Sequence, residues 1–236
     1  MLALAAAAYG MAVRRYGPST GQRLAFAGAL LIGLAAVVSP LGTLALHYFL
    51  WAHLLQNVAL AEWAPALAVL GLSSAAAAAL ARGRAVASLT HPFVALPLWL
   101  AAYGVWHIPA LYDAALEHRL LLDLEHASYV AAGFLLWWPV FQDEPRSLRA
   151  GARAAYLFAA FVLASPLGLI LALLPSPVYD FYEDTPRLWG IAPLTDQQIG
   201  GVVMAVSEGI LFFALFAYFF VRFMAEEDAG YSPGDA

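Results

Sequence analysis

The sequence predicts an all-α membrane protein, a bundle of seven transmembrane helices. Of its 236 residues, 63% are hydrophobic and only 11% are charged, whereas soluble domains carry about 25% charged residues. Six apolar runs have about the 20 residues or more that a membrane-spanning helix needs, and a seventh, at the N-terminus, is shorter. The eleven cationic residues, all arginines, concentrate in alternate connections between these runs. Together these features predict a polytopic membrane protein.

The apolar runs are helices because lipid offers no hydrogen-bond partners to an open backbone. They cover residues 1–13, 21–40, 44–71, 92–110, 124–142, 153–175 and 198–223. The first run would rise only about 20 Å as a helix, so we expect a short helix or the remnant of one that starts upstream. The third run is too long for a perpendicular span. Pro65 predicts a kink or break within it, and residues 73–80 predict an interfacial or re-entrant segment.

The arginine distribution predicts the orientation, since cytoplasmic loops of membrane proteins are rich in Lys and Arg. With the N-terminus outside and the C-terminus cytoplasmic, only Arg119 and Arg187 lie in outer connections. The inner positions then hold the other nine: Arg14, Arg15, Arg23, Arg82, Arg84, Arg146, Arg149, Arg153 and Arg222. We expect residues 1–224 to form a single helical transmembrane domain and residues 225–236 a disordered cytoplasmic tail.

Composition also excludes several classes of site. The chain has no cysteine, which excludes disulfides, thiolate metal sites and iron–sulfur clusters. No basic cluster is longer than Arg14-Arg15, so nucleic-acid binding has no electrostatic support. The polar residues inside the apolar runs are therefore the informative ones, because such residues in hydrocarbon usually mark a functional site.

Three histidines lie at the predicted outer ends of three different helices: His53, His107 and His126. Imidazoles at similar depth could converge on one metal ion, and imidazole suits copper, zinc and iron. The alternative is that they are polar anchors in the headgroup region. Asn57 shares a helix face with His53. His47 is six residues from His53, about 120° around a regular helix, so we expect it to be interfacial or to support the ligands.

Two carboxyl groups lie deep in the predicted bundle, Glu62 and Glu208. Burial of a charge in hydrocarbon is costly, so each is expected to be neutral or paired. A proton relay, a counter-ion and a hydrogen-bonded packing role all remain open.

Several short motifs together are specific. They are Ser39-Pro40-Leu41, His53-Leu54-Leu55-Gln56-Asn57, Ala64-Pro65, Leu70-Gly71, His91-Pro92, Trp106-His107-Ile108-Pro109-Ala110-Leu111-Tyr112-Asp113, Glu125-His126-Ala127-Ser128, Trp137-Trp138-Pro139, Pro186-Arg187-Leu188-Trp189-Gly190, Asp196-Gln197-Gln198 and Gly200-Gly201. From about residue 39 to 223 the chain resembles the multi-spanning CtaG family, assembly factors for haem–copper cytochrome c oxidases of the caa type.

The resemblance implies a non-catalytic copper-handling protein of the bacterial cell membrane that helps mature the oxidase at the outer membrane face. Its implied partners are cytochrome c oxidase subunits and membrane lipid, with no nucleic acid. The implied metal ligands are His53, His107, His126 and Met204, and this imidazole and thioether set favours Cu(I).

The chain departs from the family pattern beside the first of these histidines. The family usually has a second histidine where Asn57 stands, followed by a methionine where Val58 stands. After Met204 it usually has a Trp and a Pro-Gly pair, which are missing here. One alternative is therefore an accessory subunit of a respiratory oxidase complex that has lost copper binding. Another is a haem-binding electron carrier that uses histidine pairs.

Overall fold

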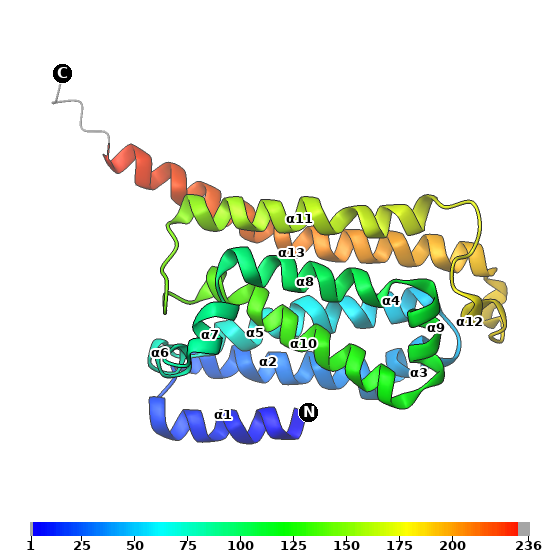
Figure 1. Ribbon diagram of the computed structural model, residues 1–236, viewed down its shortest axis with the longest axis horizontal. Coiled ribbons are helices and arrows are strands. Elements are labelled where there is room, and N and C mark those ends of the chain that lie inside the picture. Colours follow the sequence, from blue (N-terminus) through cyan, green and yellow to red (C-terminus); the bar gives the residue numbers. More distant parts are fainter. Residues whose placement is uncertain (1, 231–236) are drawn as a thin grey trace.

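The computed structural model describes residues 2–230, and every regular element within them is a helix (Figure 1). In chain order the helices are α1 (Leu2–Tyr16), α2 (Thr20–Val38), α3 (Pro40–His47), α4 (Leu50–Val58), the π-helix η1 (Ala59–Trp63), α5 (Ala64–Leu70), α6 (Ser74–Ala81), α7 (Arg84–Leu89), α8 (Pro92–Trp106), α9 (Pro109–Glu117), α10 (Arg119–Phe141), α11 (Ala150–Leu173), α12 (Asp180–Glu183), the 3-10 helix η2 (Leu188–Gly190) and α13 (Pro193–Gly230).

The long helices run side by side between two ends of the bundle (Figure 1). The short helices α3, α9 and α12 lie at one end, which we call the α12 end, and α6 and α7 lie at the opposite α6 end. Helices α11 and α13 pack most closely. A side chain on Gly201 would collide with the backbone of Gly168 and Ala172, so glycine at this position permits backbone contact between the two helices.

Four helices are long and apolar enough to cross a membrane: α2, α10, α11 and α13. Two bent pairs pass the same test when each is taken as one span. Helices α4 to α5 join α6 across a bend of 110°, and α8 joins α9 across a bend of 74°. The described residues therefore support four to six spans. The remaining predicted span, the first in chain order, corresponds to α1. Its 15 residues rise about 22 Å, which is less than the roughly 30 Å of a bilayer core.

The third apolar run is divided differently from the prediction. It breaks at Tyr48 and Phe49, between α3 and α4. The helix continues through Pro65, since Leu50–Leu70 is one continuous helix, and its backbone widens into the π-helix η1 just before the proline. A proline ring crowds the carbonyl four residues earlier, which here belongs to Ala61. That carbonyl faces Gly133 of α10, where the missing side chain leaves room for it.

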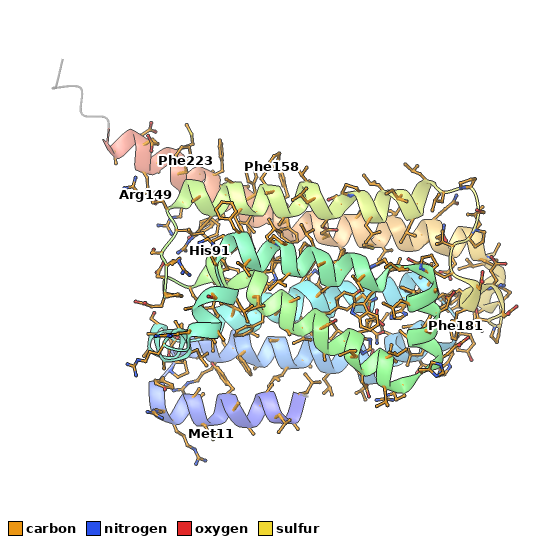
Figure 2. All side chains as sticks on the ribbon, in the orientation of Figure 1. Met11, His91, Arg149, Phe158, Phe181 and Phe223 are labelled. Atoms are coloured by element: carbon orange, nitrogen blue, oxygen red, sulfur yellow. The ribbon has the colours of Figure 1, made fainter. Side chains whose placement is uncertain are left out.

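The nine arginines assigned to inner positions belong to elements at the α6 end, and Arg119 and Arg187 lie at the α12 end (Figure 1). His91 is also at the α6 end (Figure 2). Helix α13 includes residues 225–230, for which the sequence predicts a disordered tail. Arg222 and Glu226 form an i,i+4 ion pair of 3.6 Å on this helix. The remaining tail residues, 231–236, lie outside the described residues.

Candidate metal centre

Three buried side chains near the α12 end could hold a metal ion together: His53 of α4, and Glu125 and His126 of α10. Each offers one ligand atom, and these three atoms all lie within 4.8 Å of one another. Two of the four ligands predicted from the sequence, His53 and His126, are thus brought together. Their ring centroids are 6.3 Å apart and the rings are nearly perpendicular.

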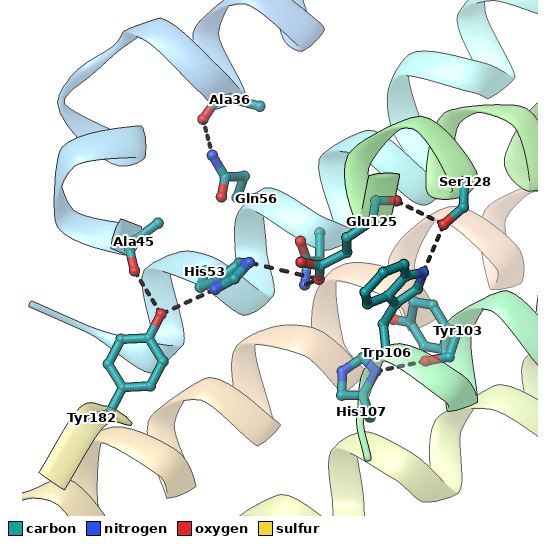
Figure 3. A network of polar contacts seen from close by, with 11 residues as sticks. Ala36, Ala45, His53, Gln56, Tyr103, Trp106, His107, Glu125, Ser128 and Tyr182 are labelled. Atoms are coloured by element: carbon teal, nitrogen blue, oxygen red, sulfur yellow. Dashed lines mark hydrogen bonds and ion pairs between the residues drawn. The ribbon is translucent and has the colours of Figure 1, made fainter. Parts of the chain in front are cut away.

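A tyrosine from a distant part of the chain orients His53. The Tyr182 hydroxyl donates to the carbonyl oxygen of Ala45 at 2.6 Å. Its oxygen is then free to accept from His53 Nδ1, 3.0 Å away (Figure 3). With the proton on Nδ1, the lone pair of His53 lies on Nε2. That nitrogen is buried without a hydrogen-bond partner, 3.8 Å from Glu125 Oε1.

His107, like His53, carries its proton on Nδ1. It caps the C-terminal end of α8, and its Nδ1 donates to the carbonyl oxygen of Tyr103 at 2.7 Å (Figure 3). Its Nε2 is therefore unprotonated, and it is also buried without a partner. The ring of Tyr112 lies against both histidines, with centroids 5.1 Å from His53 and 6.0 Å from His107. His107 does not belong to the group of three ligand atoms within 4.8 Å.

Met204 is 1% exposed on α13. It lies one helical turn after Gly200, at which a side chain would meet Trp51 and Leu54 of α4. Met204 therefore lies on the side of α13 that faces α4, the helix that carries His53.

Glu125 was not predicted as part of the site. Its Oε1 accepts from Asn57 Nδ2 at 3.0 Å, while Oε2 has no partner. Helical periodicity alone does not place Glu125 and His126 at one site, because neighbouring helix residues point about 100° apart. The signal that could have identified it is an acidic residue within an apolar run. Asn57 thus holds the carboxyl group of Glu125 beside His53.

The specific motifs from the sequence largely build the frame around this group. Trp106 Nε1 donates to Ser128 Oγ at 2.7 Å, and Ser128 Oγ donates to the backbone oxygen of Glu125 at 2.8 Å (Figure 3). These bonds fasten α8 to α10 beside the ligands. Gln56 Nε2 donates to the carbonyl oxygen of Ala36 at 2.7 Å and ties α4 to α2.

The first two residues of the Asp-Gln-Gln motif, Asp196 and Gln197, accept hydrogen bonds from backbone nitrogens of other segments. The carboxylate of Asp196 accepts from the backbone nitrogens of Leu50 at 2.8 Å and Trp51 at 3.1 Å. It therefore caps the N-terminus of α4, where Phe49 offers no side-chain cap. Gln197 Oε1 accepts from the backbone nitrogen of Val178 at 2.8 Å.

His47 ends α3 and is exposed. The helix break after His47 separates it from α4, the helix that carries His53.

The donor set fits a metal ion. The Nε2 atoms of His53, His107 and His126 are all buried without a hydrogen-bond partner. A buried polar atom without a partner is costly, and a bound cation would give such nitrogens a partner. Imidazole and carboxylate donors suit several transition metals, so the residues present are compatible with copper without selecting it.

Comparison with known proteins identifies a family. The family model for the cytochrome c oxidase caa3 assembly factor (Caa3_CtaG) matches residues 7–226. No curated protein and no solved structure gives a significant match.

Proposed function

Because this chain belongs to the cytochrome c oxidase caa3 assembly factor family, we propose that it binds copper and supplies it to a haem–copper oxidase during assembly. The observation that carries the proposal is the buried group of His53, Glu125 and His126, with ligand atoms within 4.8 Å of one another. Its role is that of a non-catalytic factor whose cargo is the metal ion.

The proposed ligands are those that the sequence predicts: His53, His107, His126 and Met204. His53 and His126 form the centre of the site, and His107 and Met204 are the further donors. Imidazole and thioether donors favour Cu(I), and no cysteine competes for it. Glu125 can add a carboxylate oxygen beside the ion, and ionisation of this group when the ion binds would reduce the cost of burying a monovalent cation in hydrocarbon.

The proposed arrangement in the membrane has seven helices, with the N-terminus outside and the C-terminus in the cytoplasm of a bacterial cell. The arginine asymmetry supports it, since the α6 end with nine arginines is the expected cytoplasmic end. The α12 end then faces outward, and with it His53, His107 and His126. The proposed partners are oxidase subunits and membrane lipid.

The assembly role is tested in the host cell by comparing oxidase purified with and without this chain. Without it, the oxidase should contain haem but less copper, and the native chain should restore the copper. His53→Ala should accumulate normally and fail to restore it. Oxidase with a full copper content in cells that lack the chain would contradict the proposal.

A second candidate function is that of an accessory subunit without copper, and Asn57 favours it. This residue stands where the resemblance implies a histidine, and its amide donates to Glu125 at 3.0 Å. A permanent subunit should co-purify with the oxidase in equal amounts through stringent detergent washes. A transient factor should be lost.

A further inference from the structure

A groove connects one of the proposed ligands to the surface. It has a volume of about 600 Å³ and lies between α1, α2 and α10. Helix α1 contributes Leu2 and Ala5, helix α2 contributes Gly33 and Val37, and helix α10 contributes Asp123 and His126. Helix α1 packs beside α2 (Figure 1), and Leu2 fits against the bare backbone of Gly33.

His126 is the member of the metal-binding group that reaches this groove. His53 is 0% exposed, Glu125 is 1% exposed and His126 is 6% exposed. The imidazole of His126 therefore belongs both to the groove wall and to the group of ligand atoms within 4.8 Å. An ion in the groove would meet His126 before it met His53.

The charged residues of the groove precede His126 on the same helix face. Asp123 lies three residues before His126, so the two side chains are neighbours on α10. Arg119 Nε donates to both carboxylate oxygens of Asp123, at 3.1 and 3.2 Å. Both side chains are more than half exposed, and an exposed ion pair of this kind is easily exchanged for other partners. Asp123 can therefore release Arg119 and attract a cation.

The remaining lining is favourable for passage. Leu2, Ala5, Gly33 and Val37 offer no side-chain donor that would retain a metal ion. At about 30 Å³ for each water molecule in the liquid, the groove can hold an ion together with its hydration shell or a small ligand.

We infer that this groove is the route by which copper reaches His126. Asp123 is the first group that attracts the ion, and Arg119 slows entry because it competes with the ion for the Asp123 carboxylate. The inference rests on the proposed function, because it requires copper to be the ion that the group binds. It adds a path and two residues that control the rate of loading.

The test separates the rate of loading from affinity. The purified full chain in detergent is mixed with Cu(I) buffered by a competing chelator, and uptake is followed in time and to equilibrium. Val37→Trp places a large ring in the groove from a position that is 40% exposed. Val38→Trp is the matched control, since Val38 is 71% exposed and does not line the groove. We expect Val37→Trp to slow loading tenfold or more, with equilibrium affinity within twofold of the native chain and Val38→Trp unchanged.

The charge variants give a second test that does not depend on tolerance of the tryptophan. Asp123→Asn should slow loading and Arg119→Gln should accelerate it. Both effects on the loading rate should become smaller at high salt, because exposed charges are screened. Native loading rates in Val37→Trp and in both charge variants would overturn the route while leaving copper binding intact. A native chain that takes up no copper at equilibrium would overturn the proposed function, and the route with it.

Discussion

The hydroxyl of Tyr182 lies 3.0 Å from Nδ1 of His53, and the two residues are 129 positions apart in the chain. The same hydroxyl donates to Ala45, so it fixes both the ring orientation of His53 and the nitrogen that carries its lone pair. A hydrogen bond of this kind, made to a metal ligand by a neighbouring group, tunes the affinity of the site.

Removing this hydroxyl should weaken copper binding without unfolding the protein. Tyr182→Phe keeps the ring packing and frees His53 to rotate or to change its tautomer. Loss of such a supporting group typically costs about 10- to 100-fold in metal affinity. Competition with a Cu(I) chelator measures the change. Tyr218→Phe is the control, since Tyr218 is 54% exposed on α13. Equal affinity in the native chain and Tyr182→Phe would show that the hydroxyl does not support the site.

Asp196 should contribute to stability as the cap of α4. Asp196→Ala leaves the backbone nitrogens of Leu50 and Trp51 without their partner, and an unsatisfied buried donor costs about 1–3 kcal/mol. Asp196→Asn should fall between the native chain and the alanine variant, because the amide retains one acceptor oxygen. Thermal unfolding in detergent measures the order, with Asp184→Ala as an exposed acidic control. Native stability in Asp196→Ala would refute the capping role.

Gly133 should tolerate no side chain. A Cβ there would collide with the carbonyl oxygen of Ala61 and the ring of Pro65, and overpacking of this kind typically costs about 1–3 kcal/mol. Gly133→Ala should therefore unfold at a lower temperature than the native chain. Gly104→Ala is the matched control in α8, because a Cβ at Gly104 meets nothing within 4 Å. Equal losses in both variants would mean that the collision is not the cause.

Asp143, at the α6 end, should make the stability of the folded protein depend on pH. The hydroxyl of Ser147 donates to its carboxylate at 2.8 Å, and this bond, together with Arg153, lowers the pKa of Asp143 below its ordinary value. Since the folded-state pKa is the lower one, the stabilisation is present above the unfolded-state pKa of about 3.9. It is lost as the pH falls through the folded-state value.

The variant Asp143→Asn, which cannot ionise at this position, tests the direction of this pH dependence. The native chain should unfold at a slightly higher temperature than the variant at pH 7, and the difference should shrink as the pH falls below about 3.9 and vanish below the folded-state pKa. The effect should be small, since the Asp143 side chain is 71% exposed. A difference that persisted unchanged in acid would exclude the carboxylate charge as its source.

The parts of the structure that the sequence predicts correctly depend on local pattern. Apolar runs predict helices because each helix satisfies its own backbone, and the predicted ends of these runs bring His53 and His126 together at one end of the bundle. The break at Tyr48 and Phe49 could not be predicted from local pattern, since the residue that caps the new helix, Asp196, lies 146 positions from Leu50 in the chain. The role of Tyr182 depends on a comparable long-range contact. The place of Glu125 beside His53 likewise depends on a contact between helices, the hydrogen bond that it accepts from Asn57 of α4, which helical periodicity does not predict.

The central claim is that His53 and His126 bind copper, and its most direct test is the copper content of the untagged chain, purified in detergent and reloaded with Cu(I). The native chain should hold one copper per chain, while His53→Ala and His126→Ala should hold almost none. Asn57→His should bind more tightly than the native chain, because it adds an imidazole one helical turn from His53. Copper in the native chain no higher than in an unrelated membrane protein purified alongside would contradict the claim and leave the accessory-subunit function in its place.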